Sequence, residues 1–124
     1  MITITTFGYL HGPAPDATIT LDLRHHYRDP YVSPELRHLT ADDAQVRTAV
    51  ASTPGIPALV DATLATVTAY LAGPSPAPTT IAVGCAGGRH RAASVGMMLD
   101  TALRTRGHDV TLVHRDLARP VVER

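Results

Sequence analysis

Eight consecutive residues, 84 to 91, read Gly-Cys-Ala-Gly-Gly-Arg-His-Arg and bring together the groups that anion chemistry needs. A loop between a strand and a helix presents unpaired backbone N–H groups, and the helix dipole adds positive potential there. Glycine lets the backbone approach a ligand closely and adopt a positive φ. The spacing therefore predicts an anion site, most simply for phosphate. The alternative is a tight turn whose arginines face water. The candidate residues are Cys85, Gly87, Gly88, Arg89, His90 and Arg91.

The loop sequence can be compared with the motifs of two classes of enzyme that act on phosphate esters or anhydrides. A nucleotide-hydrolysing P-loop needs Gly-x-x-x-x-Gly-Lys-Ser/Thr, and the chain contains no lysine. From Cys85 to Arg91 the residues do fit Cys-x-x-Gly-x-x-Arg, which resembles the phosphate loop of cysteine-dependent phosphatases. On that reading Cys85 is the nucleophile, Arg91 grips the phosphate, and Asp29 or Asp43 is the general acid. Alternatively, Cys85 is a small buried apolar side chain.

The chain length, net charge and cysteine count favour one small intracellular domain. A chain of 124 residues suits a single domain, and its formal net charge of zero argues against a broad nonspecific nucleic-acid surface. One cysteine cannot form an internal disulfide, which favours a reducing compartment. We find no signal peptide and no membrane-spanning run, and so expect a cytoplasmic protein without membrane contact. We expect no cofactor and no bound metal.

The loop must be positioned by a small sheet. β-branched and apolar patterns predict strands at 2–9, 17–23, 79–84 and 109–114, and helices at about 42–52, 56–71 and 91–106. A strand, loop, helix and strand in succession form a βαβ unit, so we expect a single α/β domain with a mainly parallel sheet and flanking helices. The domain should span residues 1–117, with a flexible tail at 118–124. The segments after residues 23, 84 and 113 should meet at one edge of the sheet.

A family resemblance covers most of the chain. Thr-Phe-Gly-Tyr at 6–9, Leu-Asp-Leu-Arg at 21–24, the glycine loop with its preceding strand at 81–91, and His-Arg-Asp-Leu at 114–117 occur in an order and spacing that resemble the C-terminal domain of the RapZ, or RNase adapter, family. The resemblance implies a fold like a sugar-phosphate-binding subdomain of phosphofructokinase. It also implies a sensor for glucosamine-6-phosphate rather than a catalyst. The family's nucleotide site belongs to a separate kinase-like domain, so we expect none here.

The resemblance also implies which residues bind the ligand. A phosphate would lie on Gly87 and Gly88, gripped by Arg91, and Asp22 or Asp43 would pair with a sugar amine or hydroxyl. His90 and His114 would tune the charge of the pocket. Two plainer roles stay open, since Asp22 and Arg24 could form an ion pair and Asp43 could cap a helix. The full implied set is Asp22, Arg24, Arg37, Thr40, Asp43, Cys85, Gly87, Gly88, Arg89, His90, Arg91, His114 and Arg115.

Departures from the family pattern leave three functions to compare. Ala86 and Ala92 replace a threonine and a serine of the family, so two hydroxyl ligands are missing. The first hypothesis is a sugar-phosphate sensor or adapter, the second a cysteine-dependent phosphatase. The third is an RNA-binding adapter, which the lysine-free C-terminus disfavours. The expected partners are a phosphorylated metabolite, a protein or RNA, and further copies of the chain as a dimer. The RNA patch would comprise Arg24, Arg28, Arg37, Arg89, Arg91 and Arg115.

Overall fold

The fold is built on one parallel sheet of four strands. The computed structural model describes residues 1–123. The strands lie in the order β2-β3-β1-β4, and every neighbouring pair is parallel. This confirms the expected α/β domain with a parallel sheet. The strands are β1 (Ile2–Gly8), β2 (Ile19–Asp22), β3 (Thr79–Cys85) and β4 (Val110–His114).

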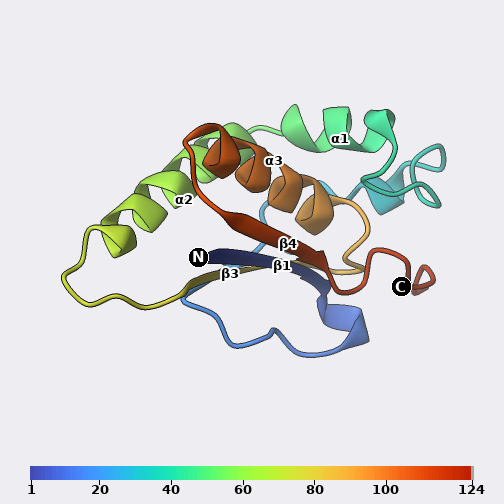
Figure 1. The fold of residues 1–124 in the computed structure, drawn as a ribbon. Coiled ribbons are helices and arrows are strands. Elements are labelled where there is room, and N and C mark those ends of the chain that lie inside the picture. Colours follow the sequence, from blue (N-terminus) through green and yellow to red (C-terminus); the bar gives the residue numbers. More distant parts are fainter. Residues whose placement is uncertain (124) are drawn as a thin grey trace.

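The described residues form three α-helices, and these cover one face of the sheet (Figure 1). They are α1 (Ala44–Ala51), α2 (Ile56–Leu71) and α3 (Arg91–Thr105), and two single-turn 3-10 helices occupy Tyr9–His11 and Pro30–Val32. No single described helix is long and apolar enough to cross a membrane, although α1 and α2 together reach that length and composition and meet at an angle of 81°.

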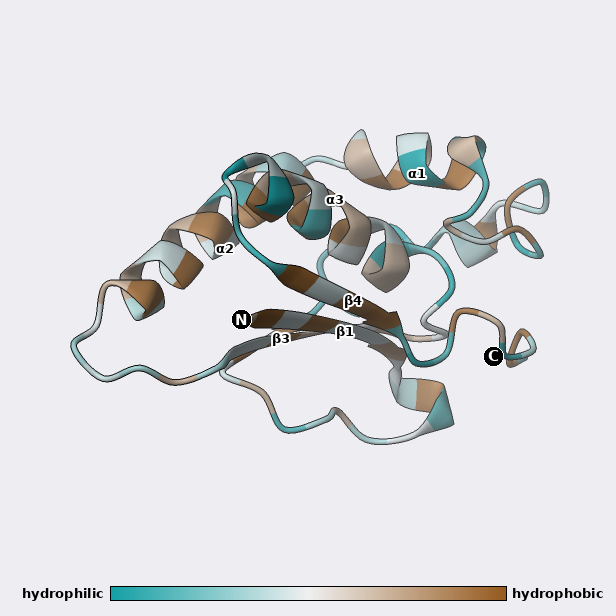
Figure 2. Cartoon of the chain, viewed as in Figure 1, coloured by the Kyte–Doolittle hydropathy of each residue, from teal (hydrophilic) through white to brown (hydrophobic). Residues whose placement is uncertain are grey.

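The core lies between the helices and the two central strands. Ile4 of β1 pairs with Ile81 of β3 on one side and with Leu112 of β4 on the other. Figure 2 shows the hydrophobic character of β1 and β4. The side chain of Thr6 lies so close to α3 that a Cβ on Gly96 would be 2.4 Å from its Cγ2 atom. Glycine at this position therefore allows α3 to pack directly on β1.

The helix bounds follow the sequence pattern except at the first helix. Helix α2 has the predicted bounds, and α3 ends one residue early. Helix α1 begins at Ala44, later than predicted, because the residues before it form a turn. In that turn the Asp43 carboxylate accepts the Thr40 N–H at 3.0 Å and bonds to no N–H of the helix. Asp43 thus occupies the N-cap position without capping the helix through its side chain.

Candidate phosphate-binding edge of the sheet

The segments that follow the four strands meet at the carboxyl edge of the sheet, as the parallel topology requires (Figure 1). The glycine loop, residues 85–91, connects β3 to α3 at this edge. Residues after Asp22 of β2 and after His114 of β4 flank the loop on either side. The predicted meeting of the three segments is therefore a property of this fold.

The glycines of the loop pack against the end of β1. A Cβ on Gly8 would lie 2.4 Å from the carbonyl carbon of Gly87, and a Cβ on Gly88 would lie 2.7 Å from the nitrogen of Gly8. Gly88 also has a φ of +77°, which disfavours any larger residue. Loop and strand end are thus in backbone contact, so these glycines serve packing in addition to any approach of a ligand.

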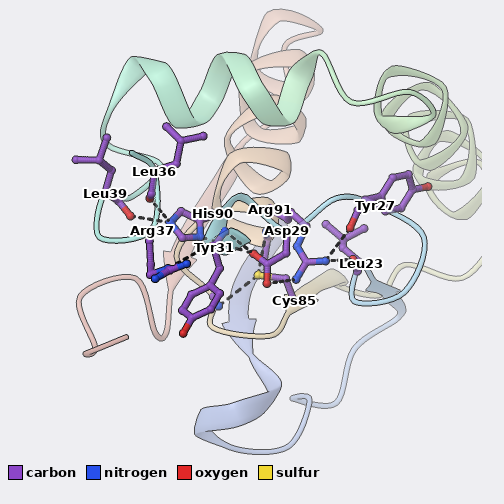
Figure 3. A network of polar contacts seen from close by, with 12 residues as sticks. Leu23, Tyr27, Asp29, Tyr31, Leu36, Arg37, Leu39, Cys85, His90 and Arg91 are labelled. Carbon is purple, nitrogen blue, oxygen red and sulfur yellow. Dashed lines mark hydrogen bonds and ion pairs between the residues drawn. The ribbon is translucent and has the colours of Figure 1, made fainter. Parts of the chain in front are cut away.

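The Cys85 sulfur lies under the loop (Figure 3). Cys85 is 2% exposed, and its Sγ accepts the N–H of Gly88 at 3.3 Å and the N–H of Ala92 at 3.4 Å. One of the N–H groups that the first turn of α3 leaves unpaired is thereby bonded to sulfur. The thiol holds the loop in its turn and is closed to solvent.

Arg91 points into the protein rather than into solvent (Figure 3). Its side chain is 4% exposed, and its Nη2 lies 3.2 Å from Oδ2 of Asp29. Its Nη1 donates to three backbone carbonyls, those of Leu23 at 3.0 Å, Arg24 at 3.2 Å and Tyr27 at 3.0 Å. The guanidinium therefore ties the segment after β2 to the start of α3.

His90 also holds the segment between β2 and α1, through hydrogen bonds further along that segment. Its Nε2 contacts the carbonyl oxygens of Leu36 at 3.0 Å and Leu39 at 2.8 Å, so Nε2 carries the proton and donates to both. Its Nδ1 lies 4.0 Å from Oδ1 of Asp29. Burial lowers the pKa of His90, outweighing the opposite effects of the two carbonyls and of the Asp29 carboxylate. The neutral imidazole is thus the form that the fold favours.

The Asp-x-Arg segment at the end of β2 forms an ion pair near the surface. Nε and Nη2 of Arg24 donate to the two carboxylate oxygens of Asp22 at 3.0 and 2.7 Å. These hydrogen bonds lower the pKa of Asp22 to about 2. The Arg24 guanidinium also stacks on the Tyr9 ring at 3.6 Å from its centre. The pair places a planar cation beside the glycine loop.

The predicted residues Arg37, Thr40 and Asp43 lie in the segment between β2 and α1, next to the carbonyls that His90 contacts. Nε of Arg37 donates to the Tyr31 carbonyl at 2.9 Å, and its guanidinium lies 4.7 Å from the centre of the Tyr31 ring. The Thr40 hydroxyl accepts the Asp42 N–H at 3.1 Å. Thr40 and Asp43 thus serve the turn before α1 in this structure.

The residues after β4 are held to the end of β1. Nδ1 of His114 and the Thr6 hydroxyl are 2.6 Å apart, and burial lowers the pKa of His114. Asp116 was not among the predicted site residues; it is fully buried and accepts the Gly8 N–H at 2.8 Å through Oδ2. Its place in the His-Arg-Asp-Leu motif, two residues after the end of β4, is the signal that could have indicated this role. The Arg115 side chain donates to Asp116 and to the carbonyls of Gly8, Gly12 and Pro13.

The last described residues lie against the mouth of the loop. Nη1 of Arg89 donates to the Arg119 carbonyl at 2.7 Å, and its Nη2 donates to the His38 carbonyl at 3.0 Å. The Tyr31 hydroxyl donates to the Glu123 carboxylate at 3.1 Å. A phosphate that used the Arg89 guanidinium would therefore meet the segment after β4.

Buried polar atoms without a hydrogen bond cluster at this edge. Five such side-chain atoms occur in the described chain, and four belong to residues of the loop or of the segments beside it. Arg89 and Arg91 each have an unpaired Nε donor, and His11 has an unpaired Nε2. The Oδ1 acceptor of Asp116 has only the Arg119 guanidinium nearby, at 3.8 Å. The edge thus holds buried donors and a buried acceptor whose hydrogen bonds are not made within the described chain. Residues 1–123 contain no group of three or more metal-binding side chains.

Comparison with known proteins agrees with the sequence pattern. A family model of the RapZ C-terminal domain matches residues 1–118. A nucleotide-binding protein of Thermobifida fusca is 36% identical over 119 residues, covering 94% of this chain and 40% of that protein. One from Frankia alni is 38% identical over 120 residues, covering 94% and 41%. One from Corynebacterium jeikeium is 36% identical over 121 residues, covering 95% and 41%. The chain spans about two fifths of the length of these relatives.

Proposed function

Because this chain belongs to the RapZ C-terminal domain family, we propose that it is a regulatory domain that binds a phosphorylated metabolite at the carboxyl edge of its sheet without converting it. The leading candidate ligand is an amino-sugar phosphate such as glucosamine-6-phosphate. In this role the domain acts in the cytoplasm, as a homo-oligomer, and passes its ligand state to a protein or RNA partner.

The cluster of unpaired buried polar atoms supports this proposal most directly. A buried donor or acceptor without a partner costs free energy, so a ligand that satisfies it is stabilised there. The Nε donors of Arg89 and Arg91 need an acceptor, which a phosphate supplies. Oδ1 of Asp116 needs a donor, which an amine or hydroxyl supplies. An amino-sugar phosphate carries both kinds of group.

The contacts of Arg91 and His90 suggest how binding is signalled. Both side chains come from the glycine loop, and both hold the segment between β2 and α1. A ligand that draws Arg91 toward a phosphate competes with its bonds to Leu23 and Tyr27. Ligand binding on the loop therefore weakens the hydrogen bonds that fix the segment between β2 and α1. The resulting change in the conformation of that segment is what a partner would recognise.

The burial of Cys85 favours binding over phosphatase chemistry. A thiolate nucleophile needs access to phosphorus, and Cys85 is 2% exposed beneath its own loop. The sulfur of Cys85 faces the N–H groups of Gly88 and Ala92 at the start of α3, and this observation keeps the phosphatase as the second candidate.

Phosphorus NMR separates these functions. We expect the ester signal of glucosamine-6-phosphate to shift saturably with added protein, with no inorganic phosphate formed over hours. Growth of inorganic phosphate, abolished by Cys85→Ser, would establish the phosphatase instead. A response to adenosine monophosphate alone would assign the site to nucleotides, the ligand class in the relatives' names. No response to either ester overturns the proposal.

A pair of arginine variants locates the binding. Arg89→Gln removes the unpaired Nε donor at the loop, so we expect affinity to fall about tenfold, as for one charge-assisted hydrogen bond. Arg106→Gln removes the same charge at the exposed far end of α3 and should leave affinity unchanged. Equal affinities of the two variants would place the ligand away from the loop. Arg91→Ala is a poor test, because it also removes the buried ion pair with Asp29 and the hydrogen bonds to three backbone carbonyls.

A further inference from the structure

A groove separate from the carboxyl edge lies between α1 and the middle and later turns of α3. Figure 1 shows these two helices side by side above the sheet. Its volume is about 410 Å³, within the range of small-molecule sites. None of the residues implied in phosphate binding lines it. The lining residues are Arg47, Ala51, Ser94, Met97, Met98, Thr101 and Ala102.

Ser94 gives the groove an unsatisfied hydrogen-bonding group. The residue is 2% exposed, and its Oγ is the fifth of the buried polar atoms that have no hydrogen-bond partner in the described chain. A hydroxyl in this state costs free energy that a ligand with an acceptor or donor at this point recovers. The other four such atoms lie at the carboxyl edge, so Ser94 is a separate indication of a ligand.

Arg47 supplies a positive charge at the exposed rim of the same groove. Its Nη1 donates to the carbonyls of Ala41 at 2.9 Å and Asp42 at 2.8 Å. These two bonds hold the guanidinium in place through one of its three nitrogens. A guanidinium fixed in this way binds a carboxylate with little loss of side-chain freedom.

The walls between these two polar groups are apolar and adaptable. Ala51 and Ala102 leave the space open, and Met97 and Met98 are flexible side chains that fit varied apolar shapes. None of the large apolar side chains that lie exposed on the described chain lines the groove. The groove itself therefore exposes little of the large apolar side-chain area that a protein partner or a second copy would bury.

We propose that this groove binds a small amphipathic carboxylate, with its apolar body against Met97 and Met98, its head on Arg47 and a polar atom at Ser94. The site is independent of the proposed phosphate site, since the two share no residue.

Methionine methyl NMR with octanoate as the probe tests this site. The chain has three methionines, and Met1 lies outside the groove as an internal reference. We expect the Met97 and Met98 methyl signals to shift saturably while Met1 stays still. Octanol, which has the same length without the charge, should bind about tenfold more weakly, as for one lost charge-assisted hydrogen bond.

Variants test the two polar anchors. Arg47→Gln should remove the preference for octanoate over octanol, whereas Arg106→Gln, at the far end of α3, should retain it. Octanoate has no polar atom besides its head, so Ser94 is tested with 8-hydroxyoctanoate. This probe should bind more tightly than octanoate to the unchanged protein and no more tightly than octanoate to Ser94→Ala. The proposal is overturned by unmoved methyl signals at millimolar octanoate, by equal non-saturating shifts of all three methionines, or by equal affinity for octanoate and octanol. Shifts that appear only on concentrating the protein would indicate contact between copies and also overturn it.

Discussion

Arg91 and Asp29 form an ion pair between the start of α3 and the segment after β2, with Nη2 and Oδ2 3.2 Å apart. The same guanidinium binds three backbone carbonyls, which carry partial charges but cannot neutralise it. Asp29 is therefore the counter-charge of a buried cation, and the carboxylate stabilises the fold as well as the site.

We expect Asp29→Asn to lower the free energy of unfolding by about 3 kcal/mol, because it leaves the Arg91 charge buried without a full partner. Urea unfolding followed by circular dichroism measures the change. Asp61→Asn, at an exposed position of α2, removes the same charge and should cost less than about 0.5 kcal/mol. Equal losses in the two variants would show that the ion pair contributes nothing specific.

Two glycines with similar backbone angles should respond differently to alanine. Gly88 has a φ of +77°, and its Cβ would lie 2.7 Å from the Gly8 nitrogen, whereas Gly107 has a φ of +88° and no atom within 4 Å of its Cβ position. We expect Gly107→Ala to cost about 1 kcal/mol from backbone strain alone. Gly88→Ala should cost about 3 kcal/mol or more, because strain and overlap add. Similar losses of stability in the two variants would mean that the end of β1 moves away from the added Cβ at position 88 without lowering the free energy of unfolding.

Acid should destabilise the protein through His90. Burial holds its pKa in the folded state below the ordinary value of 6.5, so below that pH the unfolded chain binds a proton that native His90 does not. The free energy of unfolding should therefore fall as the pH drops below 6.5. His114 shifts in the same direction, so His90→Gln should reduce the slope without abolishing it. An imidazole NMR titration of His90 at or above 6.5 would contradict the expected direction.

The single thiol should be unreactive in the folded protein. Cys85 is buried and is the only cysteine, so a thiol reagent such as Ellman's reagent reports on this one site. We expect reaction at least about a hundredfold slower than in the urea-unfolded chain, because the loop must open first. Fast labelling of the native protein would reveal an accessible thiol and strengthen the phosphatase alternative.

Periodic features of the fold could be predicted from the sequence, and irregular ones could not. The apolar residues of α2 repeat with the helical period between two stretches rich in proline and glycine, and together these patterns predicted its bounds. The start of α1 was predicted too early, because the Asp43 carboxylate bonds to the Thr40 N–H in a local turn that competes with the helix.

The site shows the same division. Parallel strands imply that the loops gather at one edge, and they do. The inward turn of Arg91 depends on carbonyls of an irregular segment more than 60 positions earlier in the chain, for which no local pattern exists. Glycines at 87 and 88 predicted close approach of a backbone, but the backbone that approaches in this structure is the end of β1. The need for small residues at 87 and 88 could be predicted from the sequence, but the segment that packs against them could not.

The hydrogen bond between the Gly8 N–H and the Asp116 carboxylate joins residues 108 positions apart, which has a consequence for synthesis on the ribosome. Among the strands of this domain β1 is translated before the others, yet it lies between β3 and β4, which come from the second half of the sequence. A nascent chain therefore exposes an apolar strand with two open edges until its partners emerge, and folding waits on contacts of long sequence separation. We expect the domain to fold after translation has passed Asp116, and to depend on chaperones for β1 until then.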